Sequence, residues 1–348
     1  MLTAPFRAFV RATLPAALQP RDESVGSVAL LADGDLQDAF SGASVLIVGG
    51  TKGIGSAIAG TLSAAGAKVV VVGRSASPPD VPGDLSTVAG CLDVVEALKA
   101  RGVPATAVDA NALPSTTLAT RYSHVIFTVG TWPDVSSPRN TDGIDKVFQL
   151  DLLARHIILT RLLEAKLLDP MGCRIMSVLA SAQHYPPSLM DGDSVRTRLT
   201  EAVKPPEAPS PQGVRDAVLT LLTTAVAHDA WLHHLGKLHA ARPISFIGTF
   251  PGLLVTDLPH TALPSWLAST LKCLMAPVAD SDEIMGRNHC SILASLPFKS
   301  TTYFAAPLLE ARLGHPLALS EEEGLGKWVY DLMEAAIEGC EEAEEEDE

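Results

Sequence analysis

The chain has 348 residues, 47% of them hydrophobic and 19% charged, and its 40 acidic and 26 basic side chains give a formal charge of -14. This length and hydrophobic content exclude a disordered chain and predict one large α/β domain or two small ones. Eight of the acidic residues lie within 338–348, so the rest of the chain carries only -6. A negatively charged body argues against nucleic acid as the main partner, because phosphates are neutralised by clustered lysine and arginine.

Cysteine usage and hydropathy indicate a cytoplasmic protein without a stable membrane span. The five cysteines form no C-x-x-C pair, which favours reduced thiols over disulfides or zinc, and no run of 18 apolar residues occurs. Arg7, Arg11 and Arg21 precede the first acidic residue, Asp22. That composition is typical of a mitochondrial transit peptide or a basic amphipathic helix, but an ordinary N-terminal helix packed on the domain is the simpler interpretation.

Apolar runs alternate with helical stretches from residue 44 onward. A strand at 44–48, a glycine turn, a helix at 56–65 and a strand at 68–72 form a predicted βαβ unit. Further strands are predicted at 105–109, 124–129, 173–179 and 243–250, with helices at 94–101, 143–166 and 214–236. Wholly apolar strands indicate a parallel sheet that is covered on both faces. The sequence therefore predicts an α/β fold with a single doubly wound, Rossmann-type parallel sheet and helices on both faces.

The predicted domain organisation has three parts. We expect an N-terminal extension over 1–40, a Rossmann-type domain over 41–337, and an acidic tail over 338–348 that self-repulsion keeps disordered. Six prolines between Tyr185 and Gly213 predict more loop than helix in that stretch.

The most informative motif is VGGTKGIG at 48–55, between the first predicted strand and helix. Glycine supplies positive φ and lets the backbone approach a pyrophosphate closely, while the helix N-terminus supplies free N–H donors. This context predicts a dinucleotide site, although a glycine turn without a ligand is the alternative. The predicted contacts in the turn are Gly49, Thr51, Lys52, Gly53, Ile54 and Gly55.

The residue that follows the second predicted strand indicates which nucleotide the site prefers. Arg74 stands where an acidic residue would select NAD, and Lys52 adds a second cation, so NADP(H) is the expected cofactor. An exposed arginine at a strand end is also an ordinary solvated residue. Asp109, after the third predicted strand, is placed to bond the adenine amine or to cap the next turn.

The chain resembles a short-chain dehydrogenase/reductase over roughly 43–260, through VGGTKGIG, VVVVGR, the VDAN stretch at Asp109 and PGLLVT at 251–256. Atypical fungal members are similar in TDGIDKVFQLDLLARHIILTRLL, RIMSVLASAQ, FIGTFPGLLVTDL and EEEGLGKWVYDL, which extends the resemblance to nearly the whole chain. The resemblance implies an NAD(P)(H)-dependent alcohol and ketone oxidoreductase with a role in secondary metabolism. It also implies cofactor contacts at Gly130, Pro251, Gly252 and Thr256.

The family's chemistry uses a Tyr and a Lys on one helix face, a Ser and an Asn. Here no tyrosine begins a Y-x-x-x-K motif, the serine position falls on Ala180, and the asparagine position is Asp151. Arg155 follows Asp151 at helical spacing, so we expect an ion pair between them rather than a proton carrier at Asp151.

The residues that directly follow the fifth predicted strand are the candidate replacements for the missing pair. Ser181, His184 and Tyr185 lie at the carboxyl edge where such sheets bind ligands, although a loop with surface histidine and tyrosine is the alternative. The histidines at 228, 233, 234 and 239 lack an H-E-x-x-H motif, so no metal site is expected.

Three functional hypotheses follow. The first is an NADP(H)-dependent oxidoreductase that acts on a small hydrophobic carbonyl or alcohol with a non-standard proton donor. The second is a catalytically degenerate relative with a non-redox role, either a cofactor-binding regulator or a scaffold for isomerisation or cyclisation. The third is a partner-binding module that uses the acidic tail. A small-molecule substrate is the expected partner, and homo-oligomerisation stays open.

Overall fold

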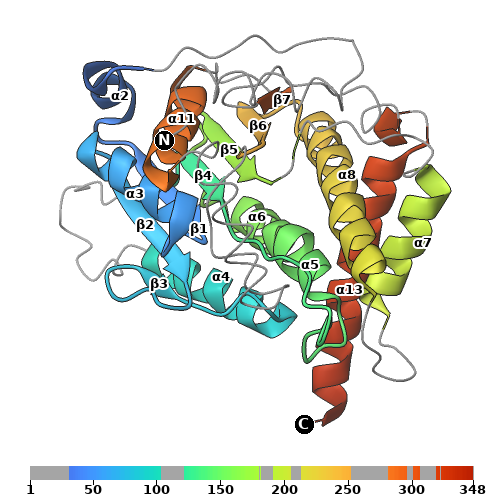
Figure 1. Cartoon of the computed structure of the whole chain (residues 1–348). Helices are drawn as coiled ribbons and strands as arrows, with labels where there is room; N and C mark the ends of the chain where they lie inside the picture. Colours follow the sequence, from blue (N-terminus) through green and yellow to red (C-terminus); the bar gives the residue numbers. More distant parts are fainter. Residues whose placement is uncertain are drawn as a thin grey trace, which may run out of the picture.

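The computed structural model describes residues 31–102, 121–179, 181, 191–204, 213–251, 281–295, 301–305, 319–321 and 323–347. Its strands form one parallel sheet in the order β3-β2-β1-β4-β5-β6-β7 (Figure 1). The predicted doubly wound parallel sheet is therefore confirmed. The strands are β1 (Ser44–Val48), β2 (Lys68–Gly73), β3 (Val81–Pro82), β4 (His124–Phe127), β5 (Cys173–Val178), β6 (Ile244–Thr249) and β7 (Thr301–Ala305).

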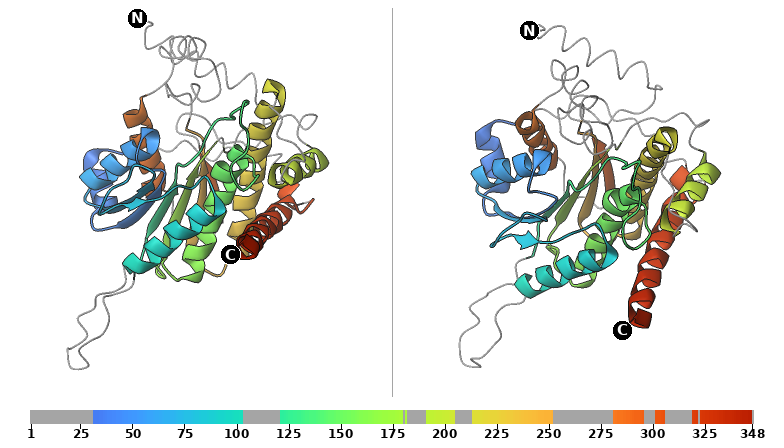
Figure 2. Two further views of the ribbon diagram at one scale, coloured as in Figure 1. Left: turned by 90° about the horizontal axis from the view of Figure 1, so that it is seen from below. Right: turned by 60° about the horizontal axis from the view of Figure 1, so that its bottom comes forward.

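Helices cover both faces of the sheet, as the apolar strands predicted (Figure 2). One face carries α2 (Asp33–Phe40), α3 (Gly53–Ala64) and α11 (Asp282–Ser295). The other carries α4 (Val88–Gly102), α5 (Lys146–Phe148), a π-helix η1 (Gln149–Leu153), α6 (Ala154–Glu164) and α8 (Val214–Leu238). Two further helices, α7 (Gly192–Val203) and α13 (Leu325–Asp347), pack outside α8.

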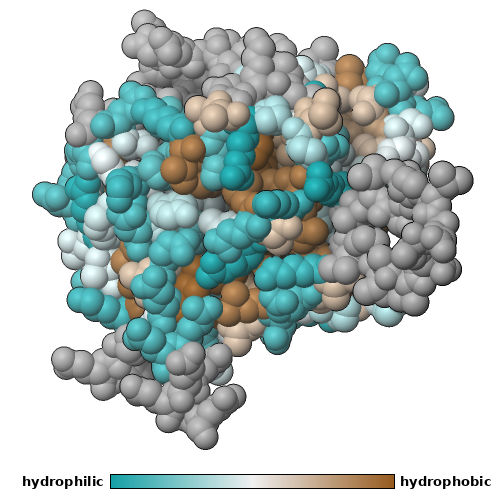
Figure 3. All heavy atoms as spheres, turned by 180° about the vertical axis from the view of Figure 1, so that it is seen from behind, coloured by the Kyte–Doolittle hydropathy of each residue, from teal (hydrophilic) through white to brown (hydrophobic). Residues whose placement is uncertain are grey.

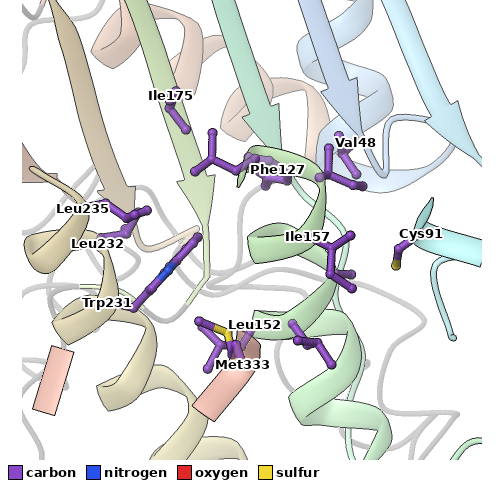
Figure 4. Close-up of a cluster of buried hydrophobic side chains, with 14 of the residues drawn as sticks. Val48, Cys91, Phe127, Leu152, Ile157, Ile175, Trp231, Leu232, Leu235 and Met333 are labelled. Carbon is purple, nitrogen blue, oxygen red and sulfur yellow. The ribbon is translucent and has the colours of Figure 1, made fainter. Parts of the chain in front are cut away.

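The larger hydrophobic core lies between the sheet and the face that carries α4, α6 and α8. Trp231 of α8 is wholly buried there and joins side chains of β4, α6 and α13 in one apolar cluster (Figure 4). Burial of large apolar side chains is the main favourable term in folding. The core thus fixes the positions of α6 and α8, the helices that carry the buried side chains of Arg155 and His228.

The proline-rich stretch after Tyr185 contains helix α7, because its prolines lie outside 192–203 and the Asp191 carboxylate accepts the Ser194 N–H at 2.8 Å as an N-cap. Two predictions about segment structure are wrong. Residues 338–347 continue α13 instead of being disordered, since Cys340 still packs on the core. Residues 33–40 form α2, whose Leu36 and Phe40 are buried, so they belong to the folded domain rather than to an extension.

Other parts of the fold were not anticipated from the sequence. The short strand β3, the helix α11 and the edge strand β7 carry no motif that the sequence patterns singled out. The strand predicted at 105–109 lies outside the described residues.

The described surface mixes hydrophilic and hydrophobic side chains, with the hydrophobic areas set between hydrophilic ones in the view from behind (Figure 3). Among the residues that the structure describes, no helix is long and apolar enough to cross a membrane, and no cluster of metal-binding side chains occurs. The described cysteines are free thiols.

Candidate functional site

The glycine turn lies between the carboxyl ends of β1 and β4, where the strand order reverses. Gly49 has a φ of 97°, and a Cβ there would overlap the Val129 backbone, reaching its Cα at 2.8 Å. A Cβ at Gly55 would meet the Gly49 carbonyl oxygen at 2.6 Å and would also overlap Thr128. Side chains are thus excluded from the floor of the turn, which leaves a backbone-lined cradle at the position where open α/β sheets bind nucleotides.

The charges around this cradle have both signs. Helix α3 begins at Gly53, with Lys52 in extended conformation at its N-cap, so its first N–H groups face the turn. Lys52 and Arg74 are exposed, and Arg74 directly follows β2. Asp282 of α11 brings a carboxylate oxygen to 3.9 Å from the Cβ position of Gly53. The cradle therefore combines two cations that favour a phosphate with one acid that opposes it.

Asp151 and Arg155 lie beside this turn but do not form the predicted ion pair. An Asp151 oxygen accepts the Thr131 N–H at 2.9 Å, and Arg155 instead donates to the Ser177 hydroxyl at 2.6 Å and to the Val129 and Val178 carbonyls. Both side chains lie close to Gly130, where an added Cβ would be 2.8 Å from an Asp151 carboxylate oxygen and 3.7 Å from an Arg155 guanidinium nitrogen.

The backbone explains why the expected pair is missing. Asp151 lies in η1, where the hydrogen bonds span five residues, so the four-residue spacing that aligns side chains on an α-helix does not apply. Burial raises the pKa of Asp151 to about 7, although Arg155 and the Thr131 N–H act in the opposite direction. Burial also lowers the pKa of Arg155 to about 10, so its guanidinium stays charged at neutral pH.

A buried polar network continues from Arg155 to α8. Ser177 of β5 bonds His228 Nε2 at 2.6 Å, and the other ring nitrogen, Nδ1, lies 3.1 Å from the Ser181 hydroxyl and 3.3 Å from an Asp229 oxygen. All four side chains are buried. Burial lowers the pKa of His228, with Arg155 acting in the same direction and Asp229 against it. Ser181 was predicted as a site residue, but its partner His228 was set aside for want of a metal motif.

One sequence signal could have identified this part of the site. His228 and Asp229 are adjacent polar residues in the largely apolar helix α8, and both are buried. Polar residues on the buried face of a helix need partners. Such a pair indicates a polar site even without a known motif.

The other predicted site residues fall into two groups. Thr51 and Ile54 are part of the glycine turn and are partly buried, and Pro251 follows β6. The remaining predicted residues lie outside the described part of the chain, namely Asp109, His184, Tyr185, Gly252 and Thr256.

Comparison with known proteins gives matches of three kinds. The family model for short chain dehydrogenases matches residues 43–89, which contain the glycine turn, β2 and β3. An uncharacterised oxidoreductase of Saccharomyces cerevisiae is 23% identical over 263 residues, covering 75% of this chain and 77% of the yeast protein.

Two solved structures share the fold. A short chain dehydrogenase of Salmonella enterica serovar Typhi is 15% identical with a TM-score of 0.50, covering 78% of this chain and 98% of its own. A putative uncharacterised protein of Mycobacterium paratuberculosis is 14% identical with a TM-score of 0.53, covering 86% of this chain and 94% of its own.

Proposed function

We propose that this chain, which is similar to short chain dehydrogenases over residues 43–89 and to an uncharacterised yeast oxidoreductase, is an NADP(H)-dependent oxidoreductase of that family that interconverts a small hydrophobic carbonyl compound and its alcohol. The observation that carries the proposal is the cradle formed by Gly49, Gly55 and the end of β4. A role in secondary metabolism, which the fungal resemblance implies, is part of the same proposal.

The residues around the cradle fit a dinucleotide. Its floor has no side chains, its N–H donors come from the start of α3, and it lies where the strand order reverses. Arg74 and Lys52 are exposed and can reach solvent-side phosphates, which supports NADP(H) rather than NAD(H). A nicotinamide cofactor supplies the hydride, and the protein has to orient the substrate and move one proton.

Buried polar groups at the same edge of the sheet can donate or accept the proton that accompanies hydride transfer. Ser181 and Asp151 are both wholly enclosed near the carboxyl ends of β5 and β4, and the pKa of Asp151 near 7 suits a general acid or base. His184 and Tyr185 stay proposed members of the site, to be tested by single replacement with turnover and NADPH binding measured side by side.

The experiment has two steps. Protein fluorescence is titrated with NADPH and NADH, and NADPH oxidation is then followed by its absorbance across aldehydes, ketones and quinones. We expect NADPH to bind at micromolar concentration and to be oxidised with at least one of these compounds. Absence of binding at millimolar NADPH would contradict the proposal at its first step.

A non-redox role is the second candidate. The observation that favours it is the absence of a Y-x-x-x-K motif in the whole sequence, which removes the usual proton donor of the family. NADPH binding without oxidation by any carbonyl compound in the screen would support this candidate over the first.

A further inference from the structure

Two buried histidines, His156 and His228, differ in the hydrogen-bond partners of their ring nitrogens. His156 of α6 accepts the Trp231 indole N–H on Nδ1 at 3.2 Å, and its Nε2 meets a Glu334 carboxylate oxygen at 2.7 Å. Indole is only a donor and an ionised carboxylate only an acceptor. His156 is therefore held in one neutral tautomer, because a proton on Nδ1 would point at another N–H.

His228 has a hydroxyl on each ring nitrogen, Ser177 on Nε2 and Ser181 on Nδ1. A hydroxyl can both donate and accept, so the neutral ring is satisfied in either tautomer. The protonated ring is satisfied too, since both hydroxyls and the Asp229 carboxylate can accept its N–H groups. His228 can thus gain or lose a proton without leaving a buried polar group unpaired. The cost that remains is the burial of the charged ring, which lowers the pKa of His228 and which Asp229 partly offsets.

The surrounding groups hold the ring in place. Arg155 Nη1 donates to the Ser177 hydroxyl at 2.6 Å, and the same guanidinium donates to the Val178 carbonyl at 3.0 Å, which ties α6 to the end of β5. Gly248 of β6 makes room for Ser181, because a Cβ there would lie 3.0 Å from the serine oxygen. The charged groups that act on His228 are Asp229 of its own helix and Arg155 of α6.

The network also reaches the proposed cofactor site through direct contacts. Arg155 donates to the carbonyl of Val129, and the backbone of Val129 forms the wall against which Gly49 packs. The chain of contacts therefore runs from the glycine turn through Arg155 and Ser177 to His228. All these groups belong to the carboxyl edge of the sheet or to the helices that cover it.

We propose that His228 is the proton carrier of this protein and that Ser181 passes the proton between His228 Nδ1 and the substrate oxygen. The proposal rests on the oxidoreductase function above. In alcohol oxidation the substrate O–H bond breaks and its proton goes to Ser181 Oγ, while the Ser181 proton goes to His228 Nδ1. The hydride leaves the alcohol carbon for the oxidised nicotinamide cofactor, so the substrate is oxidised and the cofactor reduced.

Carbonyl reduction is the reverse, in which the protonated His228 gives up its Nδ1 proton. Asp229 stabilises the cationic ring, and Ser177 with Arg155 positions it. Ser177, Ser181, His228 and Asp229 are buried, so water is excluded while the proton passes to or from the substrate. The ring exchanges its proton with solvent only after the product has left, which restores the starting state for the next turnover.

The first test uses the kinetics of the holoenzyme. Single-turnover oxidation of bound NADPH by 9,10-phenanthrenequinone is measured from pH 5 to 9 for the native chain, His228→Gln, Ser181→Ala and the matched control His156→Gln. We expect both network variants to slow hydride transfer about 100-fold, as loss of general acid catalysis does, with NADPH affinity within about threefold. His156→Gln should keep the native rate and pH profile. Native rates in Ser181→Ala and in folded His228→Gln would overturn the relay.

The second test does not depend on turnover. Nitrogen NMR of ¹⁵N-histidine protein, with resonances assigned by the same replacements, reports the tautomer of each ring with and without NADPH. We expect His228 to show mixed tautomers or titration between pH 5 and 9 and His156 to show a single neutral tautomer. A single fixed tautomer for His228 over the whole range would overturn the proposal. If the native protein oxidises no NADPH, the proposed function fails, and the NMR result still decides whether His228 carries a proton.

Discussion

Gly49 packs directly on the backbone of Val129, with a φ of 97° and its Cβ position only 2.8 Å from the Val129 Cα. This contact joins β1 to β4 at the point where the strand order reverses, and it fixes the shape of the proposed phosphate cradle. Glycine is required here for two reasons. A side chain would strain the backbone at this positive φ, and it would also overlap the backbone that follows β4.

The first prediction concerns this contact. Gly49→Ala should lower the free energy of unfolding by about 2 to 4 kcal/mol, from positive φ and overlap together, and should abolish NADPH binding. Gly60→Ala is the matched control, because Gly60 lies exposed in α3 with nothing within 4 Å of its Cβ position. The control substitution should raise the free energy of unfolding by about 0.5 to 1 kcal/mol. Urea unfolding and fluorescence titration measure both effects, and native stability in the Gly49→Ala variant would contradict the first.

Arg74 should select the cofactor. Arg74→Ala should weaken NADPH binding about 10- to 100-fold through the loss of charge-assisted bonds to the extra phosphate, with little effect on NADH. Lys68→Ala is the control, because Lys68 is also exposed but lies at the opposite end of the same strand. Dissociation constants for both nucleotides test this, and equal losses for NADPH and NADH would refute the assignment.

Arg155 should be essential for stability. Arg155→Met leaves the Ser177 hydroxyl and two carbonyls without their donor, which should cost about 3 to 5 kcal/mol, as for other broken buried charge networks. Lysine should not rescue it, since a single ammonium lacks the geometry of the guanidinium fork. Arg161→Met, on the same helix and paired with exposed Glu164, should lower the free energy of unfolding by less than about 1 kcal/mol. Similar unfolding midpoints for the two Met variants would count against this network.

Asp151 should make stability depend on pH. Its pKa is raised from 3.8 to about 7 in the folded chain, so folding favours the protonated carboxyl. The stabilisation is complete below pH 4 and is lost as pH rises through 7, at about 1.4 kcal/mol per pKa unit. The stability of Asp151→Asn lacks this dependence on pH. The variant should therefore be more stable than the native chain at pH 8 but not at pH 5. Denaturation curves at the two pH values are the measurement, and parallel pH dependence in both proteins would disprove it.

His156 should make stability depend on pH in the opposite direction to Asp151. Burial lowers the pKa of His156 in the folded chain, so folding favours the neutral ring. That contribution is complete above the unfolded pKa of 6.5 and is lost as pH falls from there through the folded value. His156→Gln should cost about 1 to 2 kcal/mol at pH 7 and should flatten the decline in melting temperature between pH 7 and 5. If the melting temperature of His156→Gln declines between pH 7 and 5 as steeply as that of the native chain, His156 does not control this decline.

Local sequence patterns predicted the part of the molecule that depends on neighbouring residues. The VVVV run, the glycines at 49, 53 and 55 and the alanine-rich stretch that follows them specify strand, turn and helix, because β-branched side chains, positive φ and helix propensity are local properties. They also specified the parallel sheet, since only a strand covered on both faces is apolar throughout.

Tertiary structure decided what depends on residues far apart in the chain. His228 lies 51 residues beyond Ser177, and only the packing of α8 over β5 brings them within a hydrogen bond. Asp151 and Arg155 have the spacing of an ion pair, yet the π-helical turn changes that spacing and each side chain hydrogen-bonds to other groups, Asp151 to the Thr131 N–H and Arg155 to the Ser177 hydroxyl. A sequence determines hydrogen-bonding groups and their local spacing, whereas burial and long-range packing choose the partner that each group finally meets.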